Sequence, residues 1–358
     1  MPNPPRRPLA RLTLVVMTCL AACHSDRASG PGSNCTNGVC PYTNVAPPPN
    51  GVAQFTVLPV APAPGLTLTA LGNLNPPGHV LPTDHVYFYA WDLSKAPGQT
   101  LTTTRNVYMP TTGALFMKLQ PGGGTDWKLM FRVTQTFYFY LDHVLPSVNI
   151  NVGDVVPAGT LIGTTDPGGT LDLGAFDQSV THGGFLTPAR YPVQTLNYVS
   201  PWKYFAPALQ PALYAQIYRT PTASDKDGVI DFGVAGKLVG DWFLQGMPAD
   251  SSGGPYGWKR TVAFVYDYYD PAKVRISIGG TIGPASVWAT DSLSPRPETV
   301  STANGVVAYH LINPFDGGPQ QGLLLVQMVS DTQIKIEYFP GSTASTGQFD
   351  GNAYTFVR

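Results

Sequence analysis

The stretch "VNINVGDVVPAGTLIGTTD", residues 148–166, has glycines at positions 153, 159 and 163 that separate short apolar runs. Runs of this length, bounded by Gly, Pro, Asn and Asp, are typical of short β-strands joined by tight turns. From the first of these glycines to the last, the order is Gly-Asp-x-Val-x-Ala-Gly-x-x-x-Gly. The stretch therefore predicts part of a β-sheet.

The composition of the whole chain indicates the same fold class. Only 12% of the 358 residues are charged, while 38 are Gly and 36 are Pro, and aromatic and β-branched residues fill the runs between them. This profile is typical of many short strands joined by turns, so we expect a mainly β chain with little helix. No basic tract indicates nucleic-acid binding, so no nucleic-acid partner is expected.

The start of the chain is typical of a secretory signal. Arg6, Arg7 and Arg11 precede an apolar run over residues 12–22, and no acid occurs among the first eleven residues. The run is too short to cross a bilayer as a helix. Its removal would take away three arginines and leave 18 basic and 22 acidic residues, which is a net charge near −4.

The end of this run, "LAAC" at residues 20–23, resembles the lipobox of bacterial lipoproteins. The resemblance implies a signal peptide over residues 1–22, cleavage before Cys23 and acylation of that cysteine; the alternative is an ordinary secreted protein. Several acyl chains would hold the protein stably in a lipid bilayer. His24, rather than Asp, follows the cysteine, which by the same resemblance implies the outer membrane if the cell is Gram-negative.

The segment after the signal is predicted to be a stalk. Residues 23–50 contain almost no large apolar group, so they can bury no core and are expected to be flexible. Within it, Cys35 and Cys40 flank an Asn-Gly dipeptide that favours a tight turn. Because export ends in an oxidising compartment, we predict a disulfide between them; the alternative, a metal-binding pair, needs further ligands.

The rest of the chain divides into two predicted domains. About 300 residues remain, which is more than one small core usually needs. A boundary fits best at residues 206–228, where prolines and a polar turn interrupt the strand pattern. We therefore expect a β domain over residues 51–205, a linker over 206–228 and a second β domain over 229–358.

Four pieces of the first domain occur in a recognisable order. They are "NVYMPTTGALFMKL" (106–119), "TFYFYLDHV" (136–144), the stretch 148–166 quoted above and "GTLDLGAFD" (169–177). Together they resemble lysostaphin-type peptidoglycan endopeptidases, whose β core belongs to the duplicated hybrid motif folds. The glycine pattern is the most specific piece. The resemblance covers roughly residues 75–180 and implies a duplicated-hybrid-motif-like β domain.

The resemblance also implies a set of site positions. That family holds zinc with an early His-x-x-x-Asp pair and the second histidine of a late His-x-His, and zinc-bound water is a nucleophile at neutral pH. In this chain the early pair becomes His85 and Tyr89, and the late one ends in Gly174, two residues after Asp172. His143 matches a catalytic histidine of the family.

These substitutions predict a degenerate domain that does not hydrolyse peptidoglycan and needs no cofactor. Two alternatives stay open. One is a working zinc peptidase. The other is a rearranged site in which His79 or Asp84 joins His85, His143 and Asp172 around a different metal or a ligand.

The second domain is predicted to be an antiparallel eight-stranded β-barrel. From residue 236 onward, eight strand-like runs are separated by turn residues at short intervals. Gly240-Asp241-Trp242, with Arg358 on the last run, is similar to the lipocalin arrangement in which a tryptophan packs under a late arginine. An eight-stranded barrel can fill with side chains or hold one small ligand.

The expected function is that of a cell-envelope lipoprotein whose first domain is a binding or regulatory module. Its partners would be the lipid bilayer, through Cys23, and peptidoglycan or an envelope protein. One alternative is a zinc-dependent peptidoglycan endopeptidase with an atypical ligand set. The other is a small-ligand carrier that uses the barrel.

Overall fold

The computed structural model describes residues 45–62, 66–89, 104–120, 124–166, 169–248, 259–315 and 317–358. The predicted signal peptide and the predicted roles of Cys23, Cys35 and Cys40 lie outside these residues. In the described part of the chain, no helix is long and apolar enough to cross a membrane.

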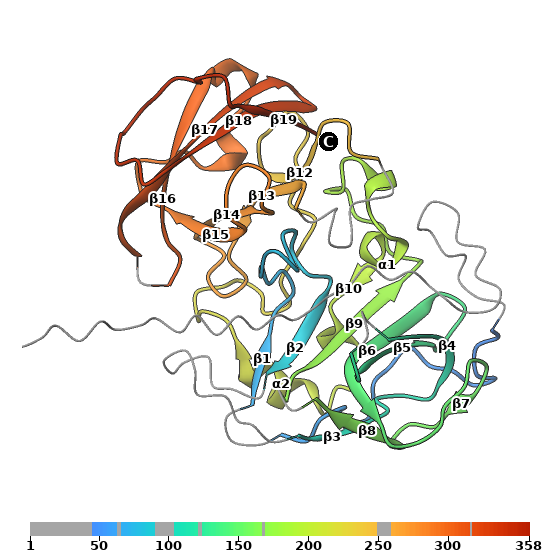
Figure 1. Ribbon diagram of the computed structural model, residues 1–358. Helices are drawn as coiled ribbons and strands as arrows, with labels where there is room; N and C mark the ends of the chain where they lie inside the picture. Colours follow the sequence, from blue (N-terminus) through green and yellow to red (C-terminus); the bar gives the residue numbers. More distant parts are fainter. Residues whose placement is uncertain are drawn as a thin grey trace, which may run out of the picture.

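The structure is mainly β, as predicted, and forms two β units that lie side by side (Figure 1). The strands of the first unit are β1 (Thr67–Thr69), β2 (His85–Tyr89), β3 (Asn106–Tyr108), β4 (Gly113–Leu119), β5 (Trp127–Arg132), β6 (Phe137–Pro146), β7 (Val155–Val156), β8 (Leu161–Thr165), β9 (Leu171–Asp177), β10 (Tyr198–Val199) and β11 (Ile217–Tyr218). The helical segments between β9 and β11 are short: η1 (Pro188–Arg190), α1 (Val193–Leu196), η2 (Pro201–Tyr204) and α2 (Gln210–Gln216).

The main sheet of the first unit follows the order β11-β1-β2-β9-β6-β5-β4-β7. At its centre, β2, β9 and β6 are antiparallel, and Val86, Leu173 and Leu141 form one cross-strand row. All three are fully buried in the hydrophobic core. Because side chains alternate along a strand, the residues between them lie on the opposite face, where polar groups gather.

The stretch 148–166 forms β7 and β8, so the predicted short strands are present. β7 pairs with β4, and β8 pairs with both β6 and β3. A Cβ atom at Gly163 would lie 2.2 Å from the Leu145 carbonyl oxygen. Only glycine permits two backbones to approach this closely, which explains the last glycine of the pattern.

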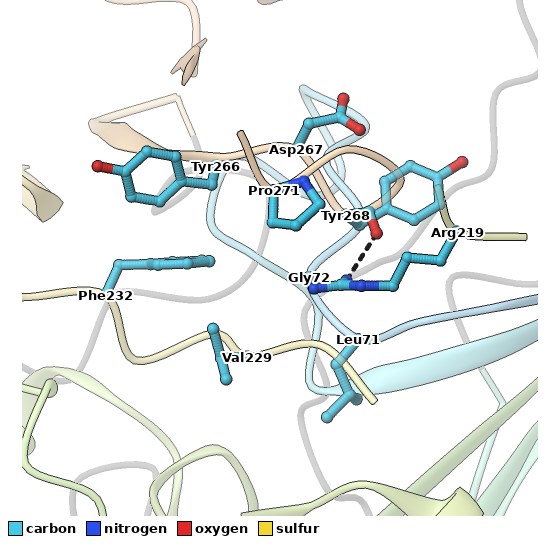
Figure 2. Close-up of a pocket in the computed structure, with 9 residues that line it drawn as sticks. All are labelled: Leu71, Gly72, Arg219, Val229, Phe232, Tyr266, Asp267, Tyr268 and Pro271. Carbon is cyan, nitrogen blue, oxygen red and sulfur yellow. Dashed lines mark hydrogen bonds between the residues drawn. The ribbon is translucent and has the colours of Figure 1, made fainter. Parts of the chain in front are cut away.

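The predicted linker, residues 206–228, contains regular structure. It includes α2 and β11, and β11 pairs in parallel with β1 through Leu68 with Ile217 and Thr69 with Tyr218. The segment therefore adds a strand to the first sheet before the chain enters the second unit. A cavity lies where loops of both units meet beside this segment (Figure 2).

The second unit closes into a ring of eight antiparallel strands in sequence order, as predicted. These are β12 (Gly240–Leu244), β13 (Thr261–Tyr266), β14 (Val274–Ile278), β15 (Ser286–Thr290), β16 (Val306–Asn313), β17 (Gly317–Ser330), β18 (Gln333–Pro340) and β19 (Tyr354–Val357). Two short helical segments, η4 (Pro297–Thr299) and η5 (Thr302–Asn304), precede β16. Buried residues including Trp242, Phe264 and Tyr309 form one core cluster inside it.

The expected contact between Trp242 and Arg358 is present. The Arg358 guanidinium lies 4.2 Å from the centre of the fully buried Trp242 ring. The same guanidinium donates to the carbonyl oxygens of Val239 (3.0 Å) and Val234 (3.1 Å) and also to that of Lys237. Arg358, directly after β19, therefore fixes the segment 234–239, which precedes β12, to the end of the last strand.

We expect Arg358→Met to lower the free energy of unfolding by about 2–4 kcal/mol, because the buried carbonyl oxygen of Val239 and the partly buried ones of Val234 and Lys237 would lose a charged donor, and Trp242 its cation. Urea unfolding followed by tryptophan fluorescence measures the change. Arg260→Met, at an exposed arginine, is the matched control. An equal, small effect of both substitutions would contradict this role of Arg358.

Candidate functional site

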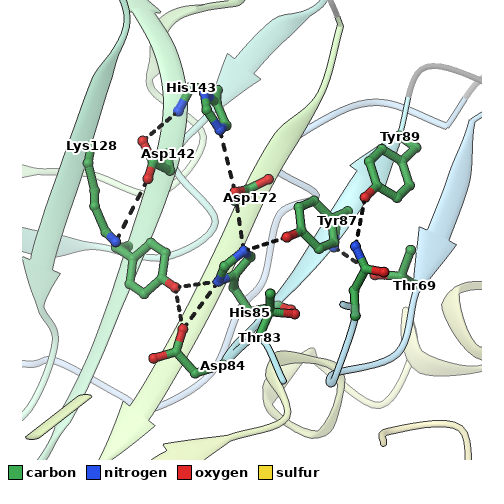
Figure 3. Close-up of polar contacts among 12 residues, drawn as sticks. Thr69, Thr83, Asp84, His85, Tyr87, Tyr89, Lys128, Asp142, His143 and Asp172 are labelled. Atoms are coloured by element: carbon green, nitrogen blue, oxygen red, sulfur yellow. Dashed lines mark hydrogen bonds and ion pairs between the residues drawn. The ribbon is translucent and has the colours of Figure 1, made fainter. Parts of the chain in front are cut away.

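The polar face of the first sheet carries most of the residues that the sequence singles out (Figure 3). Strand pairing forms two neighbouring rows on this face: His85, Gly174 and Tyr140, then Tyr87, Asp172 and Asp142. His143 follows in β6 and has a positive φ of 65°. Its backbone N–H donates to Asp142 Oδ1 (2.9 Å), which stabilises this unusual conformation and keeps His143 near Asp172.

His85 is buried, and both of its ring nitrogens have partners. Its Nε2 lies 2.9 Å from the Tyr87 hydroxyl and 3.4 Å from Asp172 Oδ2. Its Nδ1 lies 2.9 Å from the Tyr140 hydroxyl and 3.2 Å from Asp84 Oδ1. The imidazole is thus saturated by side chains of the protein itself.

Tyr140 fills the space beside Gly174, the position at which the family resemblance places a zinc-binding histidine. A Cβ atom at residue 174 would lie 2.1 Å from Cε1 of the Tyr140 ring. The ring is buried, and its hydroxyl donates to Asp84 Oδ1 (2.8 Å). The missing side chain at Gly174 is therefore what allows Tyr140 to lie against His85.

Tyr89, which replaces the family's aspartate, belongs to an aromatic stack. Its ring lies parallel to that of Tyr87, with centroids 4.7 Å apart. Its hydroxyl accepts a hydrogen bond from Asn73 Nδ2 (3.1 Å). Burial raises the pKa of Tyr89 well above its usual value, so the phenol is neutral and a poor ligand for a cation.

Asp172 lies between the two histidines. Its Oδ2 is 3.4 Å from His85 Nε2 and 3.6 Å from His143 Nε2. Its Oδ1 is buried and has no hydrogen-bond partner within the described residues. The structure thus brings His85, His143 and Asp172 together, although His143 also has a second carboxylate partner, Asp126, whose Oδ2 lies 2.7 Å from its Nδ1.

Asp84 and His79 lie on the other side of His85. Asp84 accepts a hydrogen bond from Thr195 Oγ1 (2.6 Å) in addition to its contacts with His85 and Tyr140. Although burial opposes it, these hydrogen bonds and the charges nearby hold the pKa of Asp84 well below its usual range. The His79 ring centroid is 5.2 Å from that of His85, and burial, together with His85, lowers the pKa of His79 to about 3.

Two side chains supply positive charge in the site: the His143 imidazolium and the Lys128 ammonium. Burial alone would lower the pKa of His143, but Asp172, Asp126 and Asp142 raise it to about 10. Burial raises the pKa of Asp172, while His143 and His85 oppose the rise. The Lys128 ammonium adds a second cation, 3.8 Å from Asp142 Oδ2 and 4.0 Å from the centre of the Tyr140 ring.

The residues at the family's zinc positions do not fit zinc. Gly174 offers no donor atom, Tyr140 occupies its space and Tyr89 is a neutral phenol. A different group, Asp126, Asp142 and His143, has donor atoms within 4.8 Å of one another. To bind a metal there, His143 must lose its proton, and the neighbouring carboxylates stabilise the protonated imidazole.

Several residues of this site were not predicted from the sequence: Tyr140, Lys128, Asp126, Asp142 and Thr195. A glycine inside a strand signals a close approach of some neighbour, so Gly174 could have indicated Tyr140. The partners Asp126 and Thr195 carry no such signal. Their contacts depend on how the segment before β5, which holds Asp126, and helix α1, which holds Thr195, fold against the sheet.

No family model matches the chain, and the comparison with curated proteins found no match. Among solved structures, it is similar to a zinc-containing peptidase from Vibrio cholerae (15% identity, TM-score 0.26, 35% of this chain and 37% of that one). It is also similar to the catalytic domain of the prophage-encoded protein EnpA from Enterococcus faecalis (14%, TM-score 0.26, 41% and 95%). A third likeness is to the antimicrobial peptidase lysostaphin from Staphylococcus simulans (13%, TM-score 0.27, 75% and 96%).

The chain thus spans little more than a third of the Vibrio cholerae peptidase. At these identities and TM-scores, we draw no conclusion about activity from the likenesses.

We expect Gly174→Ala to lower the free energy of unfolding by about 1–3 kcal/mol, because the added methyl group overlaps the buried Tyr140 ring. Chemical denaturation measures the loss. Gly183→Ala is the matched control, since a Cβ there meets nothing within 4 Å. In a Tyr140→Ala background Gly174→Ala should cost little, and a full cost there would show that the ring is not the obstacle.

We expect His143 to remain protonated at pH 8, and Asp126→Asn to lower its pKa because one raising partner is removed. The imidazolium's contribution to stability is then complete below the unfolded-state pKa of 6.5 and is lost as the pH rises toward about 10. NMR titration of the imidazole nitrogens measures the pKa in both proteins. A wild-type pKa near 6.5 would refute the proposed charge balance.

Proposed function

We propose that the chain is a cell-envelope lipoprotein whose first unit has the fold of a peptidoglycan peptidase without its hydrolytic centre, and that it acts as a binding or regulatory module. The proposal depends chiefly on one observation: the Tyr140 ring fills the space beside Gly174. The sequence motifs that resemble lysostaphin-type enzymes support the family assignment. The substitution of two of the three zinc positions supports the loss of hydrolysis.

The electrostatics of the site give a second argument. Although burial opposes the rise, Asp172, Asp126 and Asp142 raise the pKa of His143, so in the protein without a bound cation its imidazole carries a proton and pairs with these carboxylates. Lys128 and the His143 imidazolium together already balance the carboxylates of Asp126, Asp142 and Asp172 in part. A divalent ion would have to displace the His143 proton and compete with Lys128 for Asp142.

The anchoring part of the proposal depends on the sequence. Acylation of Cys23 would attach the chain to the bilayer, at the outer membrane in a Gram-negative cell, and the stalk would let the two β units reach their partner. Peptidoglycan is the partner that the resemblance of the sequence motifs implies, and an envelope protein is the alternative. A disulfide between Cys35 and Cys40 would lie within that stalk.

A zinc-dependent endopeptidase with an atypical ligand set is the second candidate. Two observations favour it: the donor atoms of Asp126, Asp142 and His143 lie close together, and Asp172 Oδ1 is buried without a partner in the described chain. The third candidate, a small-ligand carrier, would need space inside the barrel. The packed cluster around Trp242 and Tyr309 occupies that interior.

The test uses the mature chain purified without chelator. We expect far less than one zinc per chain by elemental analysis, no release of soluble fragments from peptidoglycan, and co-sedimentation with intact peptidoglycan. Lysostaphin on a susceptible cell wall serves as the positive control for fragment release. Stoichiometric zinc with fragment release that disappears in His85→Gln and His143→Gln would establish the second candidate instead.

A further inference from the structure

The cavity between the two units has a volume of about 60 Å³ and lies outside the site described above (Figure 2). Gly72, in the loop after β1, and Arg219, directly after β11, line it on the side of the first unit. Tyr266 and Tyr268 line it from the end of β13 and the turn that follows, and Phe232 lines it from the connecting segment. Both units therefore contribute to its walls.

Arg219 is buried in this wall and has an unused edge. Its Nη1 donates to the Tyr268 carbonyl oxygen (2.7 Å). Its Nη2 lies 3.9 Å from Asp225 Oδ2, which is beyond hydrogen-bond distance. Its Nε is buried and has no hydrogen-bond partner within the described chain. A buried guanidinium N–H without a partner is costly, so this edge is suited to an acceptor group inside the cavity.

The acids near the cavity do not neutralise Arg219 closely. Asp267 Oδ2 accepts from Arg275 Nε (2.6 Å), and Asp267 Oδ1 accepts from the backbone N–H groups of Tyr269 and Asp270. The Asp225 side chain is 48% exposed, so water screens its charge. Neither carboxylate accepts a hydrogen bond from Arg219 Nε, which stays open to another acceptor.

The remaining walls are largely apolar. The Phe232 and Tyr266 rings pack edge to face, with centroids 5.6 Å apart, and Leu71, Val229 and Pro271 add further apolar surface. Asp267 also lines the cavity, and its carboxylate is paired with Arg275. Since a water molecule takes up about 30 Å³ of liquid, the volume suits a group of a few heavy atoms. Apolar walls disfavour a doubly charged phosphate, whose desolvation costs more than that of a carboxylate.

We propose that this cavity binds a small monocarboxylate with a short apolar group. Its two oxygens accept from Arg219 Nε and Nη2, which is the side-on geometry in which a guanidinium matches a planar carboxylate. Its apolar part contacts Phe232 and Tyr266. Because both units line the cavity, the bound carboxylate also links the first sheet to the barrel.

The experiment titrates the full chain with propionate, and with propionamide and inorganic phosphate as comparisons, by calorimetry and NMR. We expect saturable binding of propionate that is at least about tenfold tighter than that of either comparison, because only the carboxylate satisfies the guanidinium fork. Arg219→Lys keeps the charge but removes the fork, so it should weaken propionate binding by about tenfold or more. Arg260→Lys, at an exposed position, should leave binding unchanged.

A second variant keeps the test decisive if Arg219→Lys impairs folding. Val229 lines the cavity and is 45% exposed, so Val229→Trp should fill the space without disturbing the core. It should abolish propionate binding while the unfolding midpoint stays near that of the wild type. Absence of saturable propionate binding, equal binding of propionamide, tighter binding of phosphate, or propionate binding that survives Val229→Trp would each overturn the proposal.

Discussion

The register of β2, β9 and β6 is the constraint on which the first unit depends. It aligns Val86, Leu173 and Leu141 in the core, and it aligns His85, Gly174 and Tyr140 on the reverse face. A slip of one residue in any strand would exchange the two faces and bury imidazole and carboxylate groups among apolar side chains. The hydrophobic row thus fixes the geometry of the polar one.

The polar row has become a self-contained network. Buried charges are tolerated only where partners satisfy them, and here the imidazoles of His85 and His143, the carboxylates of Asp84 and Asp172 and the Tyr140 hydroxyl largely satisfy one another. Such a network stabilises one arrangement of the strands.

Local patterns in the sequence predicted a good part of this structure. Glycine punctuation predicted the strands of 148–166, and the spacing of turns predicted the eight-stranded ring and the contact between Trp242 and Arg358. The bond between His143 and Asp126 and the cavity beside Arg219 were beyond prediction, since both depend on loops brought together by tertiary folding.

The parallel pairing of β11 with β1 also determines how the molecule carries mechanical load. If the chain is pulled between the start of β1 and the barrel, the two strands slide along each other, and their hydrogen bonds are strained together rather than one by one. The paired strand β11 then resists extension, whereas an unpaired linker would lengthen freely. Tension applied to one β unit would therefore be transmitted directly to the sheet of the other.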